Sequence, residues 1–180
     1  MTRYAMVIDT KTCVGCTDCV DACRMENDVP AGLCYDWVVE ATSGTYPDLS
    51  TEFRSERCNH CSHPTCVEAC PTGASQTWNA SNIVVVDATI CTGCKACIAA
   101  CPYDARLIMM PDGYIGKCTF CVQRVAKGLD PACVSVCPAR AMYFGLPDDP
   151  GSEVGRLLAT RDWYTLAPET GNQPNVYYLR

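Results

Sequence analysis

The chain has 180 residues, of which 48% are hydrophobic and 17 are cysteine, and its formal net charge at pH 7 is −6. A chain of this length is expected to form one or two domains. Its negative charge argues against nucleic-acid binding, which depends on basic patches that neutralise phosphate. A run of about 18 apolar residues, the minimum for a membrane span, is missing from the sequence.

The first half of the chain combines predicted strands with two groups of cysteines. Residues 4–8 (YAMVI) predict a strand that leads into group one. Residues 24–57 are a long insertion punctuated by proline and glycine turn signals, and residues 35–40 within it predict a second strand. Group two follows directly. The cysteines of group one are Cys13, Cys16, Cys19 and Cys23, and those of group two are Cys58, Cys61, Cys66 and Cys70.

The second half repeats this plan. Residues 83–88 (IVVVDA) predict a strand before group three, and residues 107–110 predict another before group four. A strand is expected at residues 142–144 and a helix at residues 153–161, preceded by the capping residue Ser152. The aromatic residues that follow suggest an extended tail docked on a surface. Group three consists of Cys91, Cys94, Cys97 and Cys101, and group four of Cys118, Cys121, Cys133 and Cys137.

The spacing of these cysteines indicates iron–sulfur chemistry. Four thiolates hold one cubane cluster, and C-x2-C-x2-C-x3-C-P is a ferredoxin pattern that group three matches in full. Cysteines at i, i+3 and i+6 let one loop curve around three corners of the cube, and Gly15 and Gly93 let two such loops turn tightly. In two-cluster ferredoxins the fourth cysteine ligates the other cluster, so the groups should work in exchanged pairs. Sixteen ligands predict four [4Fe–4S] clusters.

The repeat predicts an α+β fold of two interleaved bacterial-ferredoxin-like units. Adjacent groups two and three should form one unit, and groups one and four the second, wrapped around the first. The expected division is residues 1–23 with 111–145 for unit A, 24–57 for the insertion, 58–110 for unit B, and 146–180 for a C-terminal helix and docking tail.

Two other interpretations of the cysteines compete with iron–sulfur clusters. A disulfide framework is disfavoured by the odd count of 17 and by the fourfold grouping. Structural zinc is the second alternative, but zinc sites usually combine two separated C-x2-C pairs. Groups one and three instead place four cysteines within eleven residues. Iron–sulfur clusters are therefore the preferred interpretation.

Several other side chains near the cysteines have weaker assignments. Cys34, the seventeenth cysteine, is expected to be a small buried hydrophobe rather than a ligand. His60 and His63 lie within group two, where four cysteines already suffice, so they are expected to lie beside the ligands or to face solvent. Four basic residues near cysteines either adjust cluster potentials or are ordinary surface groups: Lys95, Arg106, Lys117 and Arg124.

With these motifs, the chain resembles the four-cluster electron-transfer (beta) subunits of the molybdopterin oxidoreductase superfamily. Polysulfide/thiosulfate, dimethyl-sulfoxide and respiratory arsenate reductase beta subunits are the most similar in pattern. The resemblance covers nearly all 180 residues. It is carried by YAMVID at 4–9, CVGC at 13–16, CPTGA at 70–74, AACPYDAR at 99–106, KCTFC at 117–121 and PAC at 131–133.

The resemblance implies a ligand set for each cluster. Three cysteines of one group and the last cysteine of another share a cube, which gives Cys13, Cys16 and Cys19 with Cys137; Cys118, Cys121 and Cys133 with Cys23; Cys58, Cys61 and Cys66 with Cys101; and Cys91, Cys94 and Cys97 with Cys70. It places the Cys13 cluster at one end of the relay and the Cys91 cluster at the other. Nitrate-reductase relatives carry tryptophan in place of Cys94, so four complete cubanes are implied here.

No sequence motif for substrate chemistry accompanies the cysteines. A dinucleotide fingerprint and a P-loop are both missing, so the chain is expected to be a relay rather than a catalytic subunit. The resemblance implies a molybdopterin-containing (Mo or W) catalytic partner and, beyond it, an integral-membrane quinol-reactive subunit or a soluble redox carrier. The alternative is a polyferredoxin-type relay for a cytoplasmic formate dehydrogenase or hydrogenase. The preferred location is the periplasmic side, by co-export with a signal-bearing catalytic subunit, and otherwise the cytoplasm.

Overall fold

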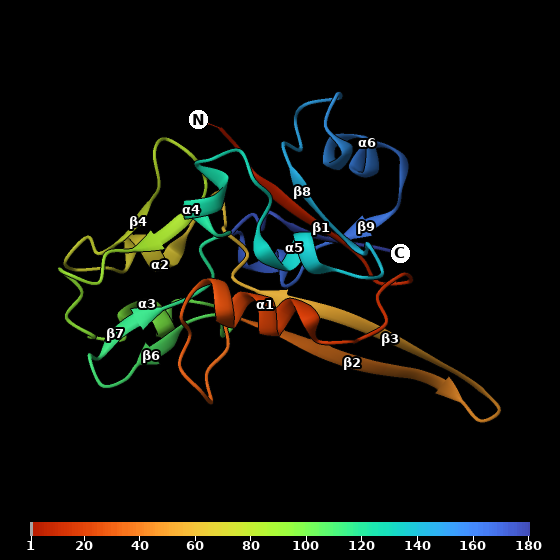
Figure 1. Cartoon of the computed structure of the whole chain (residues 1–180), viewed down its shortest axis with the longest axis horizontal. Coiled ribbons are helices and arrows are strands. Elements are labelled where there is room, and N and C mark those ends of the chain that lie inside the picture. The colour runs from red at the N-terminus through yellow and green to blue at the C-terminus, as the bar shows by residue number, and fades with distance from the viewer. Residues whose placement is uncertain (1) are drawn as a thin grey trace.

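The computed structural model describes residues 2–180, and its largest sheet brings the two ends of the chain together. The strand order is β8-β1-β10-β9. Strand β1 (Ala5–Asp9) pairs in parallel with β10 (Val176–Leu179) and antiparallel with β8 (Met142–Gly145). Strand β9 (Trp163–Tyr164) closes the edge beside β10. In Figure 1 this sheet lies between helix α6 and the helices that carry cysteines.

Both faces of β1 are buried, which explains its continuous apolar sequence. Met6 and Ile8 contribute to the core that contains cysteines of groups one, two and four. Ala5 and Val7 point to the other face, where Val154 of helix α6 (Glu153–Thr160) covers them. Alternation of side chains along a strand produces this division. The sheet therefore separates the cysteine-rich core from a small conventional hydrophobic core.

Three antiparallel hairpins complete the strands. The longest pairs β2 (Asp36–Thr45) with β3 (Asp48–Arg57) and extends away from the body as an arm (Figure 1). The other two are β4 (Ser75–Thr77) with β5 (Val84–Val86), and β6 (Leu107–Met109) with β7 (Tyr114–Gly116). Each short hairpin adjoins cysteines of groups two and three.

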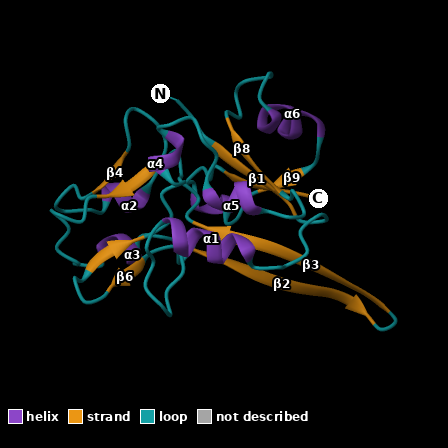
Figure 2. Cartoon of the chain, viewed as in Figure 1, coloured by secondary structure: helices purple, strands orange, loops and turns teal. Residues whose placement is uncertain are grey.

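The helices are short and most of them lie at cysteine groups, as Figure 2 shows. They are α1 (Asp18–Glu26), α2 (Thr65–Glu68), α3 (Ala96–Ala99), α4 (Val122–Val125), α5 (Ala132–Val136), α6, and the 3-10 turn η1 (Pro168–Thr170). Among the helices of residues 2–180, none combines the length and apolar character that a bilayer crossing requires.

The mixed content of helices and strands confirms the α+β class, and the predicted strands at 4–8, 35–40, 83–88, 107–110 and 142–144 are all present. The helix expected at 153–161 is also present. The C-terminal segment differs from the surface-docked tail that its aromatic residues suggest, because β10 is an inner strand with Tyr178 and Leu179 fully buried. The side chains of β10 pack beside those of β1 in the cores on both faces of the sheet.

Removal of β10 tests this role. A chain ending at Asn175 loses four buried side chains worth about 1.5–3 kcal/mol each, on the order of the 5–15 kcal/mol that stabilises a typical domain. We expect little soluble, iron-containing protein and rapid proteolysis of the remainder. The matched control omits Arg180 alone, which is exposed and stacks on Tyr164, and it should retain wild-type iron content. Equal yields from both truncations would contradict the assignment.

Candidate iron–sulfur sites

Two glycines shape the loops of groups one and three as the spacing predicts. Gly15 and Gly93 both have positive φ, +69° and +64°. A Cβ on Gly15 would stand 2.6 Å from the Phe53 ring, and one on Gly93 would stand 2.4 Å from the carbonyl oxygen of Gly113. Only glycine fits both the backbone conformation and the close approach. These loops lead directly into α1 and α3, which carry the next cysteines.

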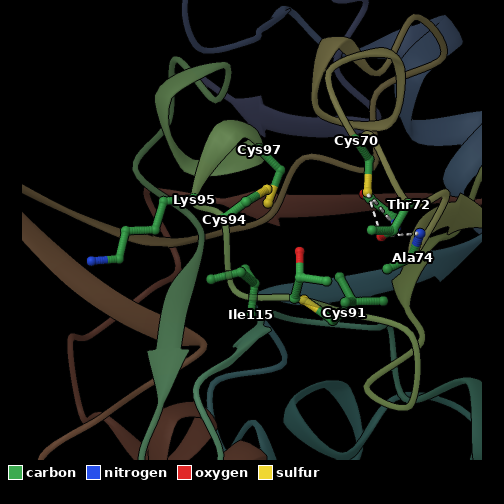
Figure 3. Close-up of a pocket in the computed structure, with 11 residues that line it drawn as sticks. Cys70, Thr72, Ala74, Cys91, Cys94, Lys95, Cys97 and Ile115 are labelled. Atoms are coloured by element: carbon green, nitrogen blue, oxygen red, sulfur yellow. Dashed lines mark hydrogen bonds between the residues drawn. The ribbon is translucent and has the colours of Figure 1, made fainter.

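Cysteines of groups two and three meet around a first cavity. It has about 290 Å³ of empty space and is lined by Cys70 together with Cys91, Cys94 and Cys97. Figure 3 shows these four side chains around a common space, with Lys95 directed away from it. The backbone N–H of Ser75 donates to the Cys70 sulfur at 3.3 Å. Burial opposes ionisation of Cys70, but the donors of Ser75, Thr72 and Ala74 together outweigh it, so the pKa of the thiol is lowered.

A second cavity joins the same two groups in the reciprocal way. About 300 Å³ of empty space is lined by Cys58, Cys61 and Cys66 of group two and by Cys101 of group three. In both cavities three cysteines of one group therefore meet the last cysteine of the other.

Groups one and four also approach each other. Asn27 at the end of α1 places its side-chain nitrogen 3.7 Å from the sulfurs of both Cys23 and Cys121. Burial raises the pKa of Cys23, and the negative charges of Cys133 and Cys121 raise it further. Burial likewise raises the pKa of Cys13, with the charge of Cys137 adding to it. The last cysteine of each group thus lies beside the first cysteines of the other.

The chemistry of the cavities suits a cluster better than a single ion. Each is lined by four cysteines, yet among the described residues no three His, Cys, Asp or Glu side chains converge closely enough to hold one metal ion such as zinc, whose bonds to sulfur are about 2.3 Å long. Among the described residues, buried N–H groups without a protein partner include Nε of Arg57 and Nε and Nη1 of Arg106. Such donors match the sulfur-rich surface of a cubane.

Burial divides the cysteines into an interior set and two exposed ends. Cys16 in group one and Cys94 in group three are exposed, whereas all the group two cysteines that line the second cavity with Cys101 are buried. Cys23, Cys118, Cys121 and Cys133 are buried as well. The two sites that include Cys16 and Cys94 therefore face the surface.

Buried thiols of these sites hold their protons strongly when no iron is present. Burial raises the pKa of Cys19 to about 11, that of Cys61 to about 12 and that of Cys133 to about 12. Because iron binds the thiolate, cluster assembly has to displace these protons. A metal centre in place of the protons then offsets part, though not all, of the negative charge that the thiolates bring.

Two arginines supply positive charge at the sulfurs. Arg57 donates from Nη1 to Cys133 at 3.0 Å, and Arg106 donates from Nη2 to Cys66 at 2.7 Å. Burial alone would lower the pKa of Arg57, but Asp36 and the neighbouring cysteine sulfurs raise it well above its ordinary value. Sequence reasoning identified Arg106 but missed Arg57, whose position directly before Cys58 was the available signal.

The remaining candidate side chains separate clearly by burial. His60 is fully buried, accepts the backbone N–H of Val84 at Nδ1 and stacks on Phe120, whereas His63 is exposed. Burial lowers the pKa of His60 far below its usual value, so the ring is neutral. Lys117 is buried and its ammonium donates to backbone carbonyls of Val84 and Cys118. Lys95 is exposed, Arg124 pairs with Glu26 at 3.2 Å, and Cys34 is half-buried.

Comparisons with known proteins agree with this geometry. Residues 49–146 and, separately, residues 12–75 match families described as 4Fe-4S dicluster domain. The chain is 43% identical to protein NrfC of Escherichia coli over 97% of its own length and 79% of the relative. It is 38% identical to a subunit of the sulfite dehydrogenase of Allochromatium vinosum (99% and 83% covered) and 40% identical to a subunit of the tetrathionate reductase of Salmonella typhimurium (98% and 72% covered).

Removal of the metal should unfold much of the protein, because metal-binding free energy becomes folding free energy when ligands lie in the core. After anaerobic oxidation and chelation of the iron, we expect far-UV circular dichroism to lose most helix and strand signal and proteolysis to accelerate. Chelator without oxidant, which leaves the clusters in place, is the control. An iron-free spectrum that overlays the loaded one would show that the fold does not need its clusters.

Gly93→Ala should weaken the group three loop through its clash with the Gly113 carbonyl. Overpacking costs about 1–3 kcal/mol, which lowers the temperature of cluster bleaching by roughly 2–12 °C for a chain of this size. Gly113→Ala is the matched control, because Gly113 also has positive φ (+78°) but no atom within 4 Å of the added Cβ. Loss of the clusters' visible absorbance on heating compares the two. Equal decreases would mean that backbone strain alone accounts for the effect.

Proposed function

The chain belongs to the iron–sulfur (beta) subunits of the molybdopterin oxidoreductases, and from this membership we propose that it holds four [4Fe–4S] clusters as a relay to a catalytic partner. Its function is electron transfer within an oxidoreductase complex. When bound, each cluster accepts and returns one electron. The observation that carries the proposal is the pair of cavities, each lined by four cysteines drawn from two groups.

The ligand sets follow the exchanged pattern in both halves. Cavity lining supports Cys91, Cys94 and Cys97 with Cys70, and Cys58, Cys61 and Cys66 with Cys101. The shared Asn27 donor supports Cys118, Cys121 and Cys133 with Cys23. The proximity of Cys13 to Cys137 supports the fourth set, which Cys16 and Cys19 complete. Two interleaved ferredoxin-like units result, one from groups one and four and the other from groups two and three.

The protein's own residues order the four sites and keep water from the inner two. The site of Cys13 and the site of Cys91 form the ends of the relay, since each contains an exposed cysteine. Exposed apolar side chains accompany both ends: Val14 in the first loop, and Ile90 and Met110 near the second. Each end thus offers a surface on which a redox partner can dock close to a ligand.

The partners of the two ends are a molybdopterin-containing catalytic subunit and an electron donor or acceptor, either an integral-membrane quinol-reactive subunit or a soluble carrier. We further propose that the complex works on the periplasmic side, where the catalytic subunit's signal carries both chains across the membrane. Under this proposal the mature catalytic subunit lacks its N-terminal leader.

Anaerobic purification of the chain with its co-eluting partners tests the function. We expect about 16 iron atoms per chain from four cubanes, together with a large molybdopterin protein whose N-terminus, read by mass spectrometry, has lost a leader. A Cys94→Ser variant serves as the control and should affect only one site. Two or four zinc atoms and no iron would disprove the relay, and a co-purified catalytic subunit with an intact N-terminus would disprove the location.

A further inference from the structure

The cysteine groups form two halves of the molecule, groups one and four in one half and groups two and three in the other. Each half contains one buried arginine that touches a cysteine sulfur. Arg57, at the end of β3, is 1% exposed and lies 3.0 Å from the Cys133 sulfur. Arg106, just before β6, is 4% exposed and lies 2.7 Å from the Cys66 sulfur. Arginine stays protonated in proteins, so both halves carry a buried positive charge beside their ligands. The two charges differ in what surrounds them.

The charge of Arg57 is paired with a buried carboxylate. Asp36 lies directly opposite Arg57 in the β2–β3 register, and a carboxylate oxygen of Asp36 stands 3.0 Å from Nη2 of Arg57. Ser55 donates its hydroxyl to the other oxygen of Asp36 at 2.6 Å and lies 3.5 Å from the sulfur of Cys19. Burial raises the pKa of Asp36, whereas the guanidinium of Arg57 and the hydroxyl of Ser55, which both donate to the carboxylate, oppose that rise and favour the ionised form. Both members of the pair are 1% exposed.

Arg106 has no such partner. Within residues 2–180, no carboxylate lies at ion-pair distance from its guanidinium, and the other side chain it contacts is the hydroxyl of Ser75 at 2.9 Å. Its Nε and Nη1 find no acceptor among the described side chains and backbone. An unpaired buried charge is costly, so the negative charge that stabilises Arg106 has to come from the cysteine sites themselves.

The reach of each charge follows the two halves. The charge of Asp36 acts on Cys13, Cys19, Cys23 and Cys133, which all belong to groups one and four. The charge of Arg106 interacts with the negative charges of Cys66, Cys58 and Cys97, which raise the pKa of the guanidinium and all belong to groups two and three. Lys117, the third buried cation, binds carbonyls of Val84 and Cys118 and lies where the halves meet.

A reduced cluster carries one more negative charge than an oxidised one. A nearby buried cation therefore raises its reduction potential and a nearby anion lowers it, with little screening in the interior. We propose that Arg106 raises the potentials of the two clusters in groups two and three, while Asp36 cancels the corresponding effect of Arg57 on the two clusters in groups one and four. This inference rests on the proposed ligand sets.

The first test removes the cancelling charge. In Asp36→Asn, which keeps the shape of the side chain, the potentials of the two clusters of groups one and four should rise. We expect the reduced-to-oxidised ratio at fixed potential to change on the order of tenfold, which is 59 mV for a one-electron couple. The double variant Asp36→Asn/Arg57→Gln removes the whole pair, and its potentials should return close to wild type. If Asp36 acted through packing alone, the reduction potentials of the double variant would not return toward those of the wild type.

The second test removes the uncancelled charge. Arg106→Gln should lower the potentials of the two clusters of groups two and three by a similar amount and leave the other pair unchanged. Arg106→Lys, the matched control, keeps a positive charge and should retain most of the wild-type potential. Equal decreases in both variants would assign the effect to hydrogen-bond geometry and overturn the role of charge.

Redox titration of the anaerobically purified complex, followed by electron paramagnetic resonance, measures these potentials, and iron is counted in every sample. Variants with full iron content but unshifted potentials, or with shifts in the wrong half, would overturn the inference and leave the relay intact. Wild-type protein without iron would instead disprove the relay. If Arg106→Gln fails to assemble its clusters, the isosteric Asp36→Asn and its double variant still decide the effect of charge on groups one and four.

Discussion

Thiolates that lie close together repel one another unless a cation stands between them. The four cysteine groups of this chain bring such sulfurs together, most of them buried and only Cys16 and Cys94 exposed. Burial raises the pKa values of thiols such as Cys19 and Cys61, so the sites are unfavourable as thiolates until iron replaces their protons. The short helices, the three hairpins and the glycine turns all serve to bring these sulfurs together. The conventional core between the main sheet and α6 is small by comparison.

The grouping and spacing of the cysteines were sufficient to predict their chemistry, because ligand geometry is local: a C-x2-C-x2-C loop needs only its own turns and a glycine such as Gly93. The strands at residues 4–8 and 142–144 were also predictable, since each is a short apolar run beside a cysteine group. The Asp36–Arg57 pair was not predictable. It depends on a hairpin register that places residues 21 positions apart opposite each other, and a charged strand end reads as a solvated surface in the sequence.

The two halves of the molecule share a pattern of cysteines but differ in their polar interior. One half encloses a complete ion pair and a serine that link Cys19 to Cys133, whereas the other encloses a guanidinium shared between Cys66 and Ser75. An internal repeat therefore does not oblige its two copies to behave identically. Buried charges, placed by β2, β3 and the segment before β6, allow equivalent ligand sets to differ.

The parallel pairing of β1 with β10 has a consequence for how the protein is made. Residues 5–9 leave the ribosome well before their partners at 176–179 are synthesised. At about 5–20 residues per second, the interval is roughly 10–35 s. Throughout that time one long edge of β1 stays open and the cysteine-rich core lacks Val176 and Tyr178. Completion of the sheet thus requires residues 176–179, and a chain that stops before them remains distinguishable, by its open core, from one ready to join a complex.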